Sequence, residues 1–183
     1  MTRRRRTWAW PVVAVVVVAL AAVTVIWFQP QKLLYDDRVD ESLPTAAAEE
    51  TPAADGGGAV VTVAPREPVD LATGTFVSRE HETVGAARVV RLPDGQVVVR
   101  LEGFATSNGP ALHVYLSQNT ATGEEAAFDE EFVDLGPLKG NVGDQNYVVP
   151  AGVDATGYTS VVIWCDRFDA AFGAADLGPA VRA

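Results

Sequence analysis

The chain has 183 residues and a formal net charge of −10 at pH 7. Four arginines, Arg3–Arg6, stand at its start, so the rest of the chain holds ten basic residues against 24 acidic ones. A surface this acidic repels phosphate backbones, which excludes nucleic acid as a partner. The single cysteine, Cys165, cannot form an intrachain disulfide, so the core alone must stabilise the fold.

The first element along the chain is an apolar segment that predicts a membrane anchor. Residues 8–28 contain no charged side chain. As a helix, about 21 residues rise roughly 31 Å, close to the hydrocarbon thickness of a bilayer. The basic tail, residues 1–7, predicts a cytoplasmic N-terminus. We therefore expect a single-pass protein of the cell membrane whose C-terminal domain is extracytoplasmic. A cleaved signal peptide is the alternative, because Ala19-Leu20-Ala21 resembles a cleavage site.

Residues 29–70 predict a flexible linker between the anchor and the folded domain. The segment is rich in Ala, Pro, Glu and Asp, includes Gly56-Gly57-Gly58, and has no aromatic residue after Tyr35. Such a composition cannot bury enough apolar surface to form a core. Residues 71–183 then form one extracytoplasmic domain, which is long enough to fold without disulfides.

Beyond Leu71 the pattern predicts an all-β domain. Short apolar runs are separated by Gly, Pro, Asn and Asp, which is typical of strands joined by turns. The sequence Pro93-Asp94-Gly95 predicts a tight hairpin turn. We expect strands at residues 74–78, 87–92, 96–101, 112–117, 147–149 and 160–165. The predicted fold class is a single small β-sandwich or barrel-like domain.

The alternation of side chains along a strand assigns the faces of the predicted sheet. His113 and Tyr115 are expected to point away from the core. The apolar run 161–165 predicts a central strand that is covered on both faces. The residues expected to point into the core are Val97, Val99, Leu101, Leu112, Val114 and Leu116.

Few residues can carry chemistry. His81, His113 and Cys165 are the only imidazoles and the only thiol, and two His with one Cys are the ligand types of a blue-copper site. Such a site needs a second His and a Met soon after the Cys, whereas Asp166-Arg167-Phe168 follows here, so the sequence disfavours copper and predicts no metal site. The acidic residues between 124 and 134 fit no calcium loop and are interpreted as a solvated loop.

Cys165 allows two interpretations. Free cysteine is often buried as a small hydrophobic side chain, and Cys165 can be core packing. A redox-active thiolate would instead need access and an electropositive neighbour. The candidates for holding a cofactor beside it are His81, His113 and Trp164.

Motifs throughout residues 74–177 resemble those of the DM-thirteen family, an electron-transfer domain found on cell-surface proteins. The resemblance implies a β-sandwich-like fold in which Cys165 is the redox residue, as a bare thiol or through a bound prosthetic group such as haem. The matching motifs are Gly74-Thr75-Phe76, His81 with Gly85, Gly109-Pro110, Leu112-His113-Val114-Tyr115-Leu116, Asp134-Leu135-Gly136-Pro137-Leu138-Lys139-Gly140, Gly143-Asp144-Gln145-Asn146-Tyr147 and Val161-Val162-Ile163-Trp164-Cys165 with Phe168, Phe172 and Gly173.

Two functions follow. In the first, a membrane-anchored redox or electron-transfer domain acts through Cys165, and a separate protein supplies or accepts the electron. In the second, the domain is a non-catalytic module that binds a partner in the cell envelope, and Cys165 only packs the core. Both describe an electron-transfer or binding module rather than a stand-alone enzyme. The expected partners are a redox or cell-envelope protein and, through residues 8–28, the lipid bilayer.

Overall fold

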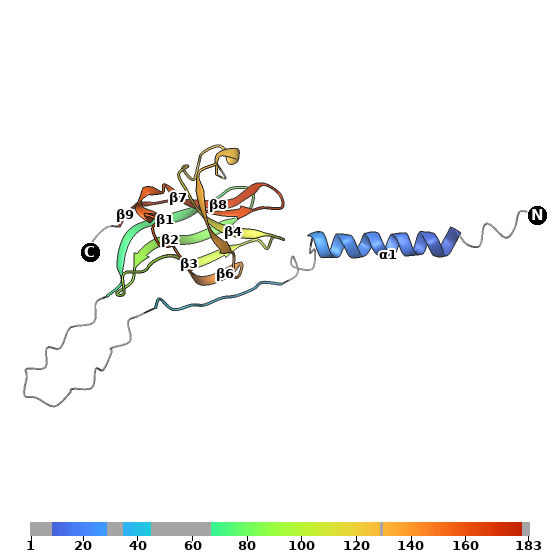
Figure 1. The fold of residues 1–183 in the computed structure, drawn as a ribbon, viewed down its shortest axis with the longest axis horizontal. Helices are drawn as coiled ribbons and strands as arrows, with labels where there is room; N and C mark the ends of the chain where they lie inside the picture. Colours follow the sequence, from blue (N-terminus) through green and yellow to red (C-terminus); the bar gives the residue numbers. More distant parts are fainter. Residues whose placement is uncertain (1–8, 29–34, 45–66, 129, 181–183) are drawn as a thin grey trace, which may run out of the picture.

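The computed structural model describes residues 9–28, 35–44, 67–128 and 130–180 (Figure 1). It contains one α-helix, nine strands and two short 3-10 helices. The elements are α1 (Ala9–Phe28), β1 (Val69–Ser78), β2 (Thr83–Arg91), β3 (Val97–Thr106), β4 (Leu112–Ser117), η2 (Glu125–Ala127), β5 (Phe132–Pro137), β6 (Val142–Val148), η3 (Ala155–Gly157), β7 (Ser160–Cys165), β8 (Ala170–Asp176) and β9 (Gly178–Pro179).

The helix α1 covers most of residues 8–28, which the sequence predicted to cross the bilayer, and that prediction is wrong for the chain as described. No helix in the described residues is both long and apolar enough to span a membrane.

Strand β1 joins two sheets into one barrel-like domain. The strands follow one another in the order β5-β4-β7-β8-β1-β2-β3-β6, and β9 pairs with β1. The first part of β1, up to Thr75, pairs with β2, whereas Phe76–Ser78 pair with β8. The two sheets therefore curve around a common interior, with β5 and β6 at the ends of the path. The all-β, barrel-like fold expected from the sequence is confirmed.

The interior side chains are those assigned by the alternation of the sequence. Val99 and Leu101 of β3 and Val114 and Leu116 of β4 are fully buried in the main core cluster, and Val97 packs against it. Tyr115 points the other way, into a second cluster with Val162, Trp164 and Phe128, because Ala121 and Phe128 cover the outer face of β7 and β8. Strand β7 is therefore covered on both faces, as predicted.

The sequence analysis missed three strands, β5, β8 and β9. In β8 the sequence Ala-Ala-Phe-Gly-Ala-Ala-Asp has few β-branched residues, so it carries little strand propensity. Tertiary packing explains the small side chains: a Cβ on Gly173 would lie 2.5 Å from Thr83 Cβ. The close approach of β2 to β8 thus excludes larger side chains at this position.

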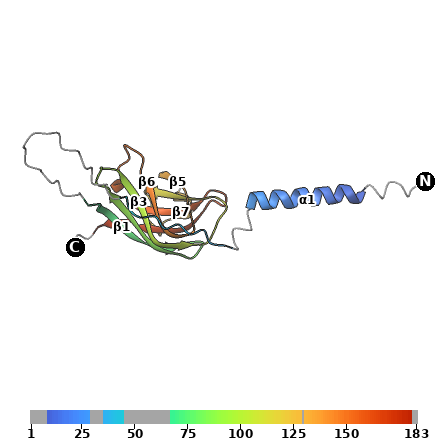
Figure 2. The same cartoon turned by 90° about the horizontal axis from the view of Figure 1, so that it is seen from below.

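Residues 35–44, which belong to the range 29–70 predicted as a linker, lie along the edge of β6 (Figures 1 and 2). We call residues 35–44 the docked segment. Arg38 forms a parallel β-bridge with Val142. At its C-terminal end, Leu43 packs against a small cluster on the outer face of β2 and β3, made of Val90, Leu92 and Val98. Residues 29–34 and 45–66 of the predicted linker lie outside the described residues.

We predict that Gly74→Ala destabilises the domain by about 1–3 kcal/mol, the usual cost of overpacking. Gly74 lies where β1 changes partners, and an added Cβ would come within 2.0 Å of the carbonyl oxygen of Asp176. Urea unfolding followed by circular dichroism measures the loss. Gly157→Ala is the matched control, because a Cβ there meets nothing within 4 Å. Equal unfolding midpoints for the two variants would contradict the prediction.

The docked segment contains a carboxylate whose ionisation stabilises its attachment. Partial burial by itself raises the pKa of Glu41. Hydrogen bonds from Lys139 Nζ and Asn146 N–H, together with the nearby positive charge of Arg100, outweigh this effect, so the pKa lies below its ordinary value of 4.5. A lowered pKa means that the attachment is fully stabilised above pH 4.5 and loses this contribution as the pH falls through the lowered value.

We therefore predict that acidification below about pH 4.5 weakens docking of residues 35–44. The amide resonances of the segment, followed by NMR during an acid titration, report its release. Glu41→Gln removes this titration and keeps the backbone hydrogen bonds between the segment and β6. A titration curve that is identical in the variant would show that Glu41 does not control docking.

Candidate functional site

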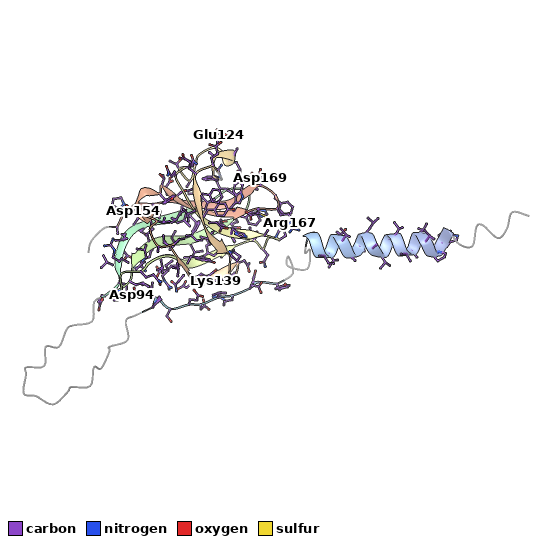
Figure 3. The ribbon with its side chains drawn as sticks, in the orientation of Figure 1. Asp94, Glu124, Lys139, Asp154, Arg167 and Asp169 are labelled. Carbon is purple, nitrogen blue, oxygen red and sulfur yellow. The ribbon has the colours of Figure 1, made fainter. Side chains whose placement is uncertain are left out.

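One end of the barrel collects the candidate residues that lie far apart in the sequence. His81 lies in the turn between β1 and β2, His113 is the second residue of β4, and Trp164 and Cys165 end β7. The turn between β1 and β2, the start of β4 and the end of β7 lie at the same end of the barrel, because neighbouring strands run antiparallel. Figure 3 shows Arg167 and Asp169, from the turn after β7, at the end of the domain opposite Asp94 and Asp154.

Cys165 lies inside this end of the barrel. Its side chain has no exposed surface and belongs to the main core cluster with Leu112 and Phe172. Leu112 is its cross-strand partner on β4. The following turn folds back over the residue, since the amides of Phe168 and Asp169 both donate to the Cys165 carbonyl oxygen, at 3.1 and 2.9 Å. The thiol is therefore separated from any partner in solution by a layer of apolar side chains and backbone.

His81 covers part of the same end from outside. Its ring stacks on Phe172, with the ring centroids 3.8 Å apart. It lines a cavity of ≈ 450 Å³ whose other lining residues include Glu80, Glu125 and Asp169. Glu125 is held at this position by Arg79, 3.6 Å away, and by a hydrogen bond from the amide of Ala171. His81 thus faces an acidic surface cavity and is separated from Cys165 by the core.

His113 lies on the outer face of the sheet, between two carboxylates. It is directly across from Trp164 in the pairing of β4 with β7. Its Nδ1 is 3.0 Å from an oxygen of Asp134, and its Nε2 is 3.6 Å from an oxygen of Asp166. The ring is partly exposed, as the alternation of β4 predicted. The two aspartates fix the orientation of the imidazole at the surface.

Trp164 and Tyr115 form an aromatic pair beside His113. Their ring centroids are 6.3 Å apart and nearly parallel, with an interplanar angle of 24°. Phe132 stacks on the other face of Tyr115, at 4.2 Å. Both members of the pair are almost completely buried, whereas the Tyr115 hydroxyl reaches Asp166 and donates a hydrogen bond of 2.6 Å. A buried aromatic pair is thus connected to a partly exposed carboxylate.

The sequence analysis did not identify Tyr115 or Asp166 as site residues. Two features of the sequence could have pointed to them: the outward position of Tyr115 in its strand, and the place of Asp166 directly after Cys165. The hydrogen bond between them spans 51 positions in the sequence. It depends on the register of β4 against β7, which periodicity alone cannot supply.

The site does not fit a haem held by Cys165. An axial thiolate must reach the iron, and the Cys165 side chain is enclosed by the core. The segments 107–110 and 138–143 contribute to a cavity of ≈ 330 Å³ at this end, but its lining residues do not include Cys165. Within the described parts of the chain, no group of three His, Cys, Asp or Glu side chains is arranged to hold a metal ion.

Comparison with known proteins gives one match. The family model described as "Electron transfer DM13" matches residues 75–177. This match covers nearly all of the barrel and confirms the resemblance expected from the sequence motifs. No curated protein and no solved structure shows significant similarity to the chain.

We predict that the thiol of Cys165 is unreactive in the native protein. A maleimide should label it at least about 100-fold more slowly in native buffer than in urea, because labelling requires opening of the core. Mass spectrometry of the intact chain measures the labelled fraction. Cys165 is the only thiol, so no competing site complicates the readout. Rapid and complete labelling without denaturant would show that the sulfur is accessible.

Proposed function

Because the chain belongs to the electron transfer DM13 family, we propose that it is a one-electron transfer module whose site is the outer face of the barrel beside Cys165. In this proposal Tyr115 is the residue that exchanges the electron, Asp166 accepts its proton, and Trp164 extends the aromatic path into the sheet. The family match supports a redox role for the barrel. The assignment to these residues rests on their geometry.

The hydrogen bond from Tyr115 to Asp166 carries the proposal. A phenol gives up its proton when it loses an electron, and a base at hydrogen-bond distance can accept that proton in the same step. At 2.6 Å, the carboxylate of Asp166 is placed for this transfer. The side chain of Asp166 is 44% exposed, so the proton can continue to water. Asp166 also lies 3.6 Å from His113, which helps to fix its position.

The step balances as a proton-coupled one-electron oxidation. The electron passes from the Tyr115 phenol to a metalloprotein partner in its oxidised, one-electron-accepting state. The phenolic O–H bond breaks, its proton binds to the carboxylate of Asp166, and Tyr115 becomes a neutral radical. The reverse step returns the electron and the proton. Neither direction requires a partner to touch the buried sulfur.

The burial of Cys165 favours electron transfer over thiol exchange. Disulfide exchange requires direct attack of a thiolate on a sulfur atom, which an enclosed side chain cannot make. Electron transfer through Tyr115 needs only contact at the outer face. The sequence-based hypothesis that Cys165 itself changes redox state remains a prediction, and the experiment below distinguishes it from the Tyr115 route.

The burial of Cys165 also favours a second candidate function. A cysteine fully enclosed among apolar side chains behaves as a small hydrophobic residue. In that case the domain is a non-catalytic binding module, and the pair of Tyr115 and Trp164 is part of its packing. The native site would then give no redox signal, so neither Cys165→Ala nor Tyr115→Phe could remove one.

Flash photolysis of the full chain tests the proposal. A photogenerated ruthenium(III) polypyridyl complex, with a cobalt(III) electron scavenger, serves as the oxidant. We predict a long-lived tyrosyl radical, detected by transient absorption and electron paramagnetic resonance, that Tyr115→Phe abolishes. Asp166→Asn should slow its formation by at least about tenfold, because the amide cannot take up the proton.

Two control variants make the result decisive. Tyr158→Phe removes a partly buried tyrosine outside the site and should leave the radical unchanged. Cys165→Ala, confirmed as folded by circular dichroism, should also leave it unchanged. Loss of the signal in Cys165→Ala alone would assign the redox change to the thiol. A signal that survives in Tyr115→Phe would remove Tyr115 from the mechanism.

A further inference from the structure

Strand β6 has a hydrogen-bonding edge that β5 does not cover. One side of β6 pairs with β3, and the order of paired strands ends there. The docked segment takes the other side. The amide of Val39 donates to the Val142 carbonyl (2.9 Å), the amide of Glu41 to the Asp144 carbonyl (2.8 Å), and the amide of Val142 to the Asp37 carbonyl (3.3 Å). The edge therefore binds an extended backbone in the parallel direction.

Two glycines shape this edge for another backbone. A Cβ on Gly140 would lie 2.3 Å from the carbonyl oxygen of Asp37, and a Cβ on Gly143 would lie 2.1 Å from that of Val39. Gly143 also has a φ of +106°, a conformation that other residues rarely adopt. Any side chain at these two positions would push the docked segment away.

Basic and amide side chains give the edge a preference for acidic segments. The Nζ of Lys139 lies 2.8 and 2.9 Å from the two carboxylate oxygens of Glu41, and the backbone N–H of Asn146 donates to the same carboxylate. The guanidinium of Arg100, whose side chain is only 8% exposed, donates to the Glu41 carbonyl at 2.9 Å. The positive groups thus converge on one residue of the bound segment.

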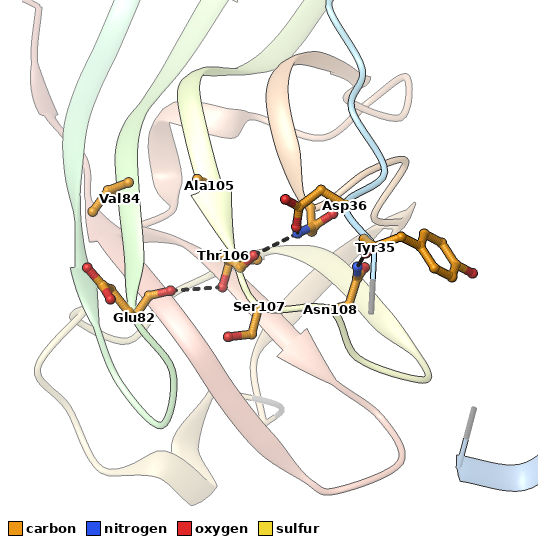
Figure 4. A pocket seen from close by; sticks show the side chains of 9 residues that line it. Tyr35, Asp36, Glu82, Val84, Ala105, Thr106, Ser107 and Asn108 are labelled. Atoms are coloured by element: carbon orange, nitrogen blue, oxygen red, sulfur yellow. Dashed lines mark hydrogen bonds between the residues drawn. The ribbon is translucent and has the colours of Figure 1, made fainter. Parts of the chain in front are cut away.

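The other end of the segment is held by side-chain amides. Asn141 accepts a hydrogen bond from the backbone N–H of Asp37 and donates one to the Asp36 carboxylate. The amide of Asn108 donates to the Tyr35 carbonyl at 2.6 Å. Tyr35, Asp36 and Thr106 line a cavity of ≈ 390 Å³, and Figure 4 shows the side chains around it. The first two residues of the docked segment thus form part of the wall of this cavity.

The docked segment and the edge belong to different parts of the chain. The edge lies within residues 75–177, which match the family model, whereas the docked segment precedes them. Residues 45–66, 22 positions, separate the segment from the next described residues. All contacts between segment and edge are noncovalent, so a separate peptide with the same chemistry can make them. Adding a strand to an exposed sheet edge is a recurring mode of peptide recognition.

We propose that the edge of β6, with Lys139 and Arg100, is a binding site for extended acidic peptide segments of partner proteins, and that residues 35–44 occupy it in cis. Backbone hydrogen bonds provide affinity, and the contacts to Glu41 and Asp36 provide the preference for acidic side chains. The covalent connection gives the chain's own segment an effective concentration in the millimolar range, so it competes with free peptides. The site is independent of the electron-transfer proposal.

Full-length variants with a weakened cis segment test this site. Val39→Pro removes the N–H that bonds to Val142, and adding Glu41→Arg in the same chain reverses the charge that faces Lys139. The probe is a fluorescent synthetic peptide with the sequence of residues 35–44. We expect saturable binding to the double variant, measured by anisotropy, and at least about tenfold weaker binding to the wild-type chain.

Control variants test the specificity of the edge. A Lys139→Gln substitution, added to the double variant, should weaken binding at least about tenfold, in the range of a charge-assisted contact. A peptide that carries proline in place of the valine corresponding to Val39 should not bind. Absence of saturable binding to the folded double variant would overturn the proposal, and unchanged binding after Lys139→Gln would overturn the preference for acidic segments.

Discussion

The structure depends on one strand that belongs to both sheets. β1 pairs with β2 up to Thr75 and with β8 from Phe76 onward, so a single continuous backbone connects the two halves of the barrel. The change of partner requires β8 to approach closely, and Gly74 leaves room for the Asp176 carbonyl. Without this connection the two sheets would expose their inner faces. The main core cluster, including Cys165, would then face water.

The same connection assembles the candidate site. Because the barrel closes through β1, the turn that carries His81 comes to the end at which β7 finishes with Trp164 and Cys165. Alternation along β7 then separates two neighbouring residues: Cys165 enters the core, whereas Trp164 joins Tyr115 on the outer face. The buried thiol and the hydrogen-bonded aromatic pair thus lie on opposite faces of the sheet. This arrangement is the reason that we assign electron exchange to the outer face.

The open path of strands explains the docked segment. Because the order of paired strands ends at β6, this strand presents backbone groups that no other strand pairs with. An unpaired edge of this kind promotes association with other chains. Residues 35–44 satisfy this edge with their own backbone, and Glu41 adds a contact to Lys139. In our proposal the same edge also serves recognition, since the features that hold the cis segment would also hold a similar segment of another protein.

The sequence by itself determined the local properties of this protein. Alternating apolar residues indicated the class of the fold and the faces of β3 and β4, because the period of a strand depends only on neighbouring residues. The uninterrupted apolar run of β7 indicated a strand covered on both faces. The family motifs, spread over the barrel, indicated a redox role that the family match supports. The apolar run 8–28 predicted a membrane span, but no helix in the described residues is both long and apolar enough to provide one.

Only the tertiary structure decided the features that depend on distant partners. Strand β8 is rich in alanine and glycine, and it is a strand because β7 and β1 flank it. The docked segment resembles a linker in composition, and its partner β6 lies about 100 positions away. The Tyr115 to Asp166 hydrogen bond depends on the register of β4 against β7. The apolar run 161–165 allowed a buried Cys165, but closure of the barrel decided between burial and an accessible thiol.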